Sequence, residues 1–231
     1  MSEYKTVFLD LDDTVWDFTT NSKIALEEIY RCYSLDRFYP TFDLYYKTYS
    51  EKNTELWNLY HHGRMTKEIL VTERFRYPLQ LVGVDDTELA KRLDKDYLSV
   101  LSRLPNLVMG ARELLDYLVS KYTLGIISNG FNETQYRKID ASGIGHYFSE
   151  IVLSDEIGIN KPHPDIFKEA LHRMSIEAAD AIMIGDNYDA DIRGAMHCGI
   201  DQIYFNPLSK PIEEEKPTYE VTSLLEVMKI L

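Results

Sequence analysis

An apolar run that ends in clustered carboxylates, Val7-Phe8-Leu9-Asp10-Leu11-Asp12-Asp13-Thr14, constrains this chain more than any other stretch. Such a run predicts a buried strand whose C-terminal end delivers acids to the edge of an open α/β sheet, where such sheets place their chemistry. Asp10 and Asp12 are two residues apart and therefore share a face of the strand. Two carboxylates this close repel each other, and a divalent cation relieves that repulsion.

These two acids suit covalent phosphoryl transfer. We expect Asp10 to attack phosphorus, and Asp12 to protonate the leaving oxygen and later deprotonate water. A calcium loop opens in the same way, but it also requires Gly at its sixth position and Glu at its twelfth. This chain has Val15 and Asn21 there, so we exclude that loop. Taken alone, the stretch is also compatible with an acidic strand end that only solvates a turn.

Composition narrows the class of protein. The chain has 231 residues, 45% of them apolar, enough for one large domain or a core with a smaller insert. A formal charge of −13 disfavours nucleic acid and anionic membranes as partners. Cys32 and Cys198 form no metal or disulfide pattern, which suits a reducing cytoplasm. We find no leader pattern, and no apolar run approaches the roughly 18 residues of a membrane span.

The stretch from about Asp17 to Leu104 is rich in Tyr, Leu, Glu and Lys, has few Gly and shows helical spacing of its apolar residues. The spacing predicts four helices, at about Ser22 to Tyr33, Phe42 to His61, Thr66 to Leu81 and Thr87 to Leu101. Because this block directly follows the first strand, we expect it to act as a lid.

Strands and helices alternate from Leu107 onward, which predicts a parallel, doubly wound sheet with right-handed crossovers. The expected later strands are Thr123–Ser128, Glu150–Leu153, Ala181–Ile184 and Gln202–Phe205. The expected helices are Gly110–Lys121, Asn132–Ser142, Asp165–Met174, Asp189–Cys198 and Ser223–Ile230, with a surface loop at Asn206–Pro217. Residues 1–16 and 105–231 should then form a Rossmann-like α/β core, and residues 17–104 an inserted α-helical cap domain.

Polar groups also follow the second strand and lie in a later loop. Ser128 offers a hydroxyl, and Asn129 and Gly130 offer backbone donors, at the mouth of the next helix, where a phosphate oxygen is readily bound. Ser128 by itself is more often a helix cap. Lys161 supplies a cation that could hold the phosphate and restrain Asp10, although a lone loop lysine is usually only solvated.

The strand that ends at Gly185 is followed by another group of acids. Asp186 is placed to complete a magnesium site with Asp10. A dry, unpaired carboxylate there costs several kcal/mol, so a cation is expected. Asp191, one turn later, could hydrogen-bond Lys161 or a water on the metal, with Asn187 as a further supporting residue.

In order and spacing, these segments resemble the four motifs of the haloacid dehalogenase (HAD) superfamily. The matching residues are Asp10-Leu11-Asp12-Asp13-Thr14, Ser128-Asn129-Gly130, Lys161-Pro162, and Gly185-Asp186 with Asp191. The likeness covers nearly the whole chain, and the helical insert resembles the α-helical (C1-type) cap subclass.

The resemblance implies a magnesium-dependent aspartyl-phosphate mechanism, with Asp10 as nucleophile and Asp12 as acid and base. Mg²⁺ would be held by the Asp10 carboxylate, the Asp12 main-chain carbonyl and Asp186. Ser128 and Lys161 would contact the phosphate. True dehalogenases of the superfamily lack the acid two residues after the nucleophile, so Asp12 favours phosphate chemistry.

Two further runs, Trp57 to Arg64 and Ile127 to Phe131, are similar to the nucleoside 5′-monophosphatase branch, which favours pyrimidine nucleotides. The rings of Trp57 and Tyr60 could stack on a base when the lid closes, and they could equally be packing within the cap. Related branches that act on sugar phosphates or phosphoglycolate share this cap type.

We therefore expect a cytoplasmic, monomeric or homodimeric phosphatase that acts on a small phosphomonoester, with a nucleoside monophosphate as the favoured substrate. The alternatives are a sugar-phosphate or phosphoglycolate phosphatase and a β-phosphoglucomutase-like phosphotransferase. A non-catalytic binding protein on the same fold is disfavoured by the intact set of motif residues.

Overall fold

The structure is a computed structural model that describes residues 4–212 and 215–231. Residues 1–3 of the expected core and residues 213–214 of the expected loop lie outside the described residues. The chain divides into two compact units, Met1–Phe18 with Pro105–Leu231, and Thr19–Leu104.

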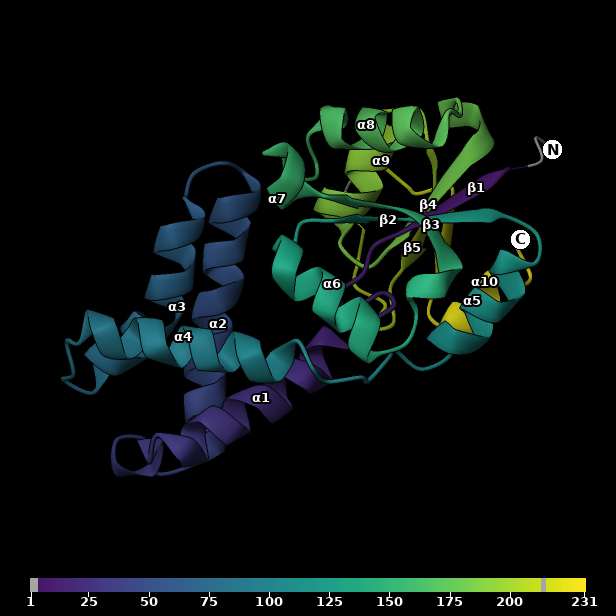
Figure 1. The fold of residues 1–231 in the computed structure, drawn as a ribbon. Coiled ribbons are helices and arrows are strands. Elements are labelled where there is room, and N and C mark those ends of the chain that lie inside the picture. Colours follow the sequence, from purple (N-terminus) through teal and green to yellow (C-terminus); the bar gives the residue numbers. More distant parts are fainter. Residues whose placement is uncertain (1–3, 213–214) are drawn as a thin grey trace. The chain divides into compact units, whose positions relative to one another are not determined.

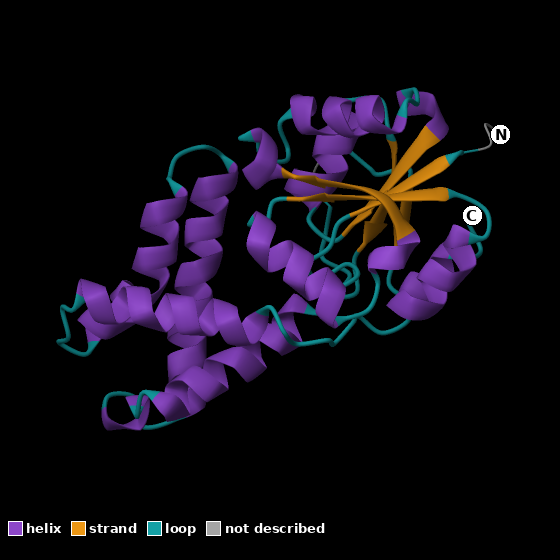
Figure 2. Cartoon of the chain, viewed as in Figure 1, coloured by secondary structure: helices purple, strands orange, loops and turns teal. Residues whose placement is uncertain are grey.

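A six-stranded parallel sheet forms the centre of the first unit, with strand order β3-β2-β1-β4-β5-β6 (Figure 2). The strands are β1 (Thr6–Leu9), β2 (Thr123–Ser128), β3 (Phe148–Leu153), β4 (Ala181–Gly185), β5 (Asp201–Phe205) and β6 (Tyr219–Val221). This arrangement confirms the predicted doubly wound parallel sheet. The edge strand β6 was not predicted, because only one of its three residues is buried and it carries no apolar run.

Helices cover both faces of this sheet (Figure 1). One face carries α8 (Pro164–Met174) and α9 (Gly194–Met196), and the other carries α5 (Ala111–Val119), α6 (Asn132–Ala141) and α10 (Leu224–Val227). Phe8, Ile127 and Met183 of the sheet pack with Ile166 and Phe167 of α8 in one buried cluster. Burial of both faces explains why β1 and β4 read as continuous apolar runs.

Short elements complete this unit. They are α7 (Ser154–Ile157), the 3₁₀ turns η2 (Gly145–Tyr147) and η3 (Ala178–Asp180), and the π-helix η4 (Tyr188–Arg193). The expected helix Asp189–Cys198 is therefore a π-helix followed by the short α9. A π-helical turn inside a helix often marks a functional site.

The second unit is helical. It contains most of α1 (Phe18–Cys32), the 3₁₀ turn η1 (Leu35–Arg37), α2 (Phe42–His61), α3 (Lys67–Leu81) and α4 (Thr87–Leu101). The bounds of α2 and α4 are those predicted. The first helix begins at Phe18 instead of about Ser22, and Asn21 and Ser22 are buried within it. Among the described residues, no helix is both long and apolar enough to cross a membrane.

A buried ion pair lies in the core of the helical unit. Arg74 of α3 is 2% exposed, and its Nε donates to Asp94 Oδ1 of α4 at 2.7 Å. The guanidinium also lies over the Tyr97 ring, 5.3 Å from its centroid. Tyr49 and Phe75 pack on the same ring. The pair therefore fixes the register of α3 against α4 in an aromatic core.

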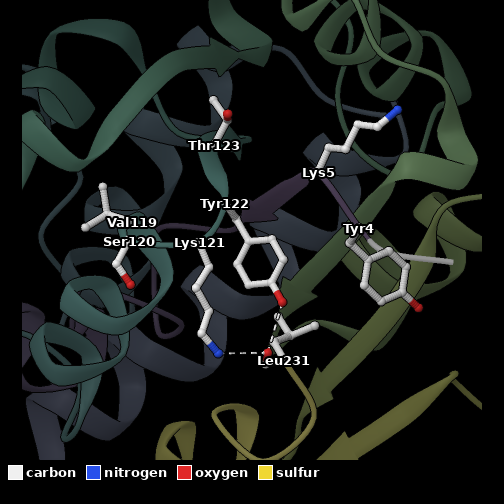
Figure 3. A pocket seen from close by; sticks show the side chains of 8 residues that line it. All are labelled: Tyr4, Lys5, Val119, Ser120, Lys121, Tyr122, Thr123 and Leu231. Carbon is white, nitrogen blue, oxygen red and sulfur yellow. Dashed lines mark hydrogen bonds between the residues drawn. The ribbon is translucent and has the colours of Figure 1, made fainter. Parts of the chain in front are cut away.

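A cavity of about 890 Å³ lies where β1 and β2 begin (Figure 3). Tyr4, Lys5 and Tyr122 line it, and Lys121 and Tyr122 both donate hydrogen bonds to the carbonyl of Leu231. Because the strands are parallel, this cavity is at the opposite edge of the sheet from Asp10, which follows the end of β1.

We predict that Asp94→Ala destabilises the protein by about 3–5 kcal/mol, because it leaves the Arg74 guanidinium buried without its partner. Asp96→Ala on the exposed face of the same helix should cost less than about 1 kcal/mol. Urea unfolding followed by circular dichroism measures both variants. Equal, small losses would show that the Arg74–Asp94 pair does not anchor the helical unit.

Candidate active site

Asp10 lies at the C-terminal end of β1, between two central strands. Its backbone N–H donates to the carbonyl of Ile184 in β4 at 2.9 Å, which continues the strand pairing one residue beyond β1. The residue is 8% exposed. The pairing with β4 and the burial of the residue together fix the direction in which the Asp10 carboxylate points.

Lys161 ties three segments together. Its ammonium donates to Asp10 Oδ1 at 2.5 Å, to Asp191 Oδ1 at 2.7 Å and to the carbonyl of Ile127 in β2 at 2.6 Å. An ammonium has three protons, so all of its donors are used. Lys161 is 2% exposed, and a buried charge of this kind is stable only when it is fully paired.

Asn129 holds the backbone of Lys161 in place. Its side-chain Nδ2 donates to the Lys161 carbonyl at 2.9 Å, and its Oδ1 accepts from the Lys161 N–H at 2.7 Å. The loop after β2 and the loop that carries Lys161 are therefore joined by a two-point amide contact. The sequence predicted that the backbone of Asn129 binds phosphate, and this contact of its side chain was not predicted.

The acids after β4 are held in a similar way. Asp186 Oδ1 accepts from the Thr14 hydroxyl at 3.0 Å, and Asp191 Oδ2 accepts from the backbone N–H of Asn187 at 3.0 Å. The Asn187 side chain accepts from the N–H of Ala190 at 3.0 Å and so begins the π-helix η4. A Cβ at Gly185 would come within 2.4 Å of Asp191, so only glycine admits the carboxylate there.

Asp10, Asp186 and Asp191 form an acidic cluster in which one carboxylate oxygen from each residue lies within 4.8 Å of the other two. Three carboxylates face one ammonium, which leaves an excess of negative charge in a largely buried site. Hard oxygen donors in this number suit Mg²⁺. Both oxygens of Asp191 already accept hydrogen bonds, so Asp10 and Asp186 are the better ligands, and the residues present fit a divalent cation.

Electrostatics agree with this geometry. Burial raises the pKa of Asp10 to about 7 although Lys161 opposes the shift, and Asp191 and Asp12 add to it. Burial, together with Asp10 and Asp191, also raises the pKa of Asp186 well above its usual range. Burial disfavours the charge on Lys161, but Asp10 and Asp191 outweigh that effect and raise its pKa. Lys161 therefore stays protonated, and its single positive charge does not balance the three carboxylates of the acidic cluster.

Asp12 lies apart from this acidic cluster and faces α6. Its Oδ2 accepts from Gln135 Nε2 at 2.9 Å and its Oδ1 from Lys138 Nζ at 2.7 Å. Gln135 Nε2 also donates to Ser128 Oγ at 2.7 Å, which in turn accepts from the N–H of Gly130 at 3.2 Å. The structure thus places Asp12 and Ser128 on either side of one amide.

Gln135 and Lys138 were not predicted as site residues. Both are buried on α6, whose composition is otherwise that of a polar surface helix. Their spacing of three residues puts them on one face of the helix and is the only signal that could have indicated them.

The doubly wound parallel sheet gathers buried acids and a fully paired lysine at its C-terminal edge, and a helical insertion follows its first strand. Together these features define a Rossmann-like enzyme core with a helical cap. The family profile described as a hydrolase, "haloacid dehalogenase-like hydrolase", matches residues 4–199. The chain belongs to this family of hydrolases.

Relatives along the whole chain agree with this assignment. The chain is 32% identical to the HAD-hydrolase YfnB of Bacillus subtilis, over 100% of this chain and 97% of that protein. A crystal structure of YfnB bound to magnesium matches with a TM-score of 0.89 at 31% identity, over 99% of this chain and 98% of that one.

Two relatives carry named activities. Pyrimidine 5′-nucleotidase YjjG of Escherichia coli is 28% identical over 97% of this chain and 96% of its own. Glyceraldehyde 3-phosphate phosphatase of Methanothermobacter thermautotrophicus is 32% identical over 95% and 92%.

We predict that Mg²⁺ binding strengthens with pH. A carboxyl group whose pKa is higher in the folded than in the unfolded protein stabilises the metal-free folded state at a pH below its unfolded-state pKa. That stabilisation is lost as the pH rises through the folded-state pKa. For Asp10 this window runs from 3.8 to about 7. Because the cation must displace the proton, affinity measured by calorimetry should be about 10-fold tighter near pH 8 than near pH 6. Equal affinities would contradict the assignment of Asp10 as a ligand.

Proposed function

We propose that this protein is a magnesium-dependent phosphomonoesterase in which Asp10 attacks phosphorus. The observation that carries the proposal is that the buried Asp10 carboxylate accepts from the Lys161 ammonium at 2.5 Å and lies in one acidic cluster with Asp186. The contact with Lys161 holds one oxygen and thereby orients the other. An oriented carboxylate is the nucleophile that such a reaction needs.

The reaction has two half-steps. An oxygen of Asp10 forms a bond to phosphorus as the bond to the leaving oxygen breaks, and the leaving oxygen takes a proton from Asp12. Water then attacks the phosphorus of the aspartyl phosphate and gives a proton to Asp12, which releases inorganic phosphate and regenerates Asp10. General acid–base help of this kind is worth about 10²–10⁴-fold in rate.

The remaining motif residues support binding. Mg²⁺, held by the Asp10 carboxylate, the Asp12 main-chain carbonyl and Asp186, would neutralise charge on the phosphoryl oxygens. The Ser128 hydroxyl and the backbone N–H of Asn129 would donate to them, and the Gly130 N–H, which donates to Ser128 Oγ, would hold that hydroxyl in place.

The favoured substrate is a nucleoside 5′-monophosphate with a pyrimidine base. The nearly full-length similarity to YjjG supports this choice. In the helical unit, Trp57, Tyr60 and His61 form a cluster at the end of α2, with Trp57 about 5.5 Å from each partner between ring centroids. These rings are only half-buried, which suits stacking on a base. Glyceraldehyde 3-phosphate is the second candidate, because the relative that hydrolyses it is as similar along the chain.

Asp10→Asn should lower hydrolysis of p-nitrophenyl phosphate by at least about three orders of magnitude while the fold is retained, because the amide is a poor nucleophile. Phosphate release is measured with and without EDTA. Asp180→Asn, the same substitution in a pair with Lys5 at the opposite edge of the sheet, is the control. Normal turnover by Asp10→Asn would refute the role of Asp10.

A substrate panel at fixed Mg²⁺ tests the substrate class. We expect kcat/KM to be highest for UMP, dUMP and dTMP and lower for glyceraldehyde 3-phosphate, phosphoglycolate and glucose phosphates. Trp57→Ala should then lower kcat/KM for the nucleotides by about 10-fold, since stacking on one ring is worth about 1–3 kcal/mol, and should leave p-nitrophenyl phosphate hydrolysis unchanged. A highest value for a triose or sugar phosphate would contradict the nucleotide assignment.

A further inference from the structure

Asp12 is held from one helix by both of its carboxylate oxygens. Gln135 and Lys138 are three residues apart on α6 and donate to Oδ2 and Oδ1 respectively. A carboxylate that accepts two well-aligned hydrogen bonds has a fixed plane as well as a fixed position. Asp12, which lies in the loop after β1, is therefore oriented by α6.

Gln135 links this carboxylate to the phosphate side of the site. It is 0% exposed, and its Nε2 donates both to Asp12 and to Ser128 Oγ. The nitrogen of the amide faces both acceptors, and an amide NH₂ group has two protons to donate. A single planar group thus sets the separation between Asp12 and the Ser128 hydroxyl.

The loop after β2 is shaped around this amide. A Cβ at Gly130 would lie only 2.2–2.7 Å from side-chain atoms of Gln135. Any other residue at position 130 would displace Gln135, because a Cβ atom cannot lie so close to the atoms of another side chain. The glycine in the Ser128-Asn129-Gly130 segment thus has a second use, which is to admit Gln135.

Lys138 is held laterally by aromatic rings. It is 3% exposed, and its Nζ lies 4.5 Å from the centroid of the Trp16 ring and 5.6 Å from that of Phe18. Such cation–π contacts fix an ammonium when it is removed from water. The two rings therefore help to hold the donor to Asp12 Oδ1 in place.

We propose that Gln135 and Lys138 are positioning residues that hold the Asp12 carboxylate at the leaving-group oxygen, with Gln135 setting its distance from the phosphate through Ser128. This inference rests on the proposed phosphatase function and adds two residues outside the four motifs. A misplacement of about 1 Å in a reacting group can cost about 10²-fold in rate.

The test compares two leaving groups. The p-nitrophenolate ion departs without a proton, whereas an alkoxide such as the nucleoside 5′-oxygen requires one from Asp12. For Gln135→Met we expect kcat/KM to fall about 10- to 100-fold with UMP and less than about 3-fold with p-nitrophenyl phosphate. Lys138→Met should show the same contrast. Loss of stability or of substrate binding alone would lower both values equally.

Gln202→Met is the matched control. Gln202 is a buried glutamine in β5 of the same unit, and its side-chain amide donates to the carbonyl of Ile200 and accepts from the hydroxyl of Thr218. It carries the same loss of an amide and the same added thioether, and it should leave the ratio of the two kcat/KM values at the wild-type level.

A measurement that does not need turnover accompanies the kinetics. In nitrogen–proton correlation spectra the side-chain amide of Gln135 should shift when Asp12 is replaced by Ala, and Gln202 should not. An unshifted Gln135 amide, or a wild-type ratio of kcat/KM values in Gln135→Met, would overturn the inference alone. A wild-type protein that releases phosphate from no substrate in the panel would overturn the proposed function, and this inference with it.

Discussion

The ammonium of Lys161 is the interaction on which the rest of the site depends. It is buried and binds acceptors from three segments that are distant in sequence: Asp10 after β1, the Ile127 carbonyl in β2 and Asp191 in η4. Removing one partner of such a buried charge costs about 3–5 kcal/mol. The same contacts that stabilise the core therefore assemble the candidate active site, and Asn129 reinforces them through the backbone of Lys161.

Negative charge remains after that lysine is satisfied. Asp10, Asp186 and Asp191 face one ammonium, and the second buried lysine of the site, Lys138, is paired with Asp12. Burial, together with the neighbouring carboxylates, raises the pKa values of Asp10 and Asp186. A site of this kind binds a divalent cation or protons, and a bound cation would allow a chain with a net charge of −13 to accept the proposed anionic phosphomonoester.

Much of the core was predictable from sequence, because local signals there agree with the tertiary structure. Apolar runs bounded by turn residues predicted β1, β2 and β4. The acids that follow β1 and β4 come together at one edge of the sheet with the lysine of the loop after α7. Gln135 and Lys138 were not predictable, since burial of a polar side chain depends on partners that are distant in sequence. Asp12 and Trp16 supply those partners 122 or more residues earlier in the chain. The three-residue strand β6 was not predicted for a related reason, because its pairing with β5 leaves no local pattern in the sequence.

Chemistry and substrate choice have different origins in this chain. In the proposed function the reacting residues belong to the sheet-containing unit, whereas the aromatic cluster around Trp57 belongs to the helical unit. Fold alone fixes neither, and dehalogenases and phosphatases share this architecture. Asp12, held from α6, is the residue that favours phosphate chemistry here.

The most direct measurement of the central claim is a crystal structure with Mn²⁺ in place of Mg²⁺, in which anomalous scattering locates the cation without reference to activity. We expect one strong peak bound by carboxylate oxygens of Asp10 and Asp186, with the Lys161 ammonium still in contact with Asp10. A cation bound elsewhere, or an Asp10 carboxylate turned away from both the cation and Lys161, would contradict the account.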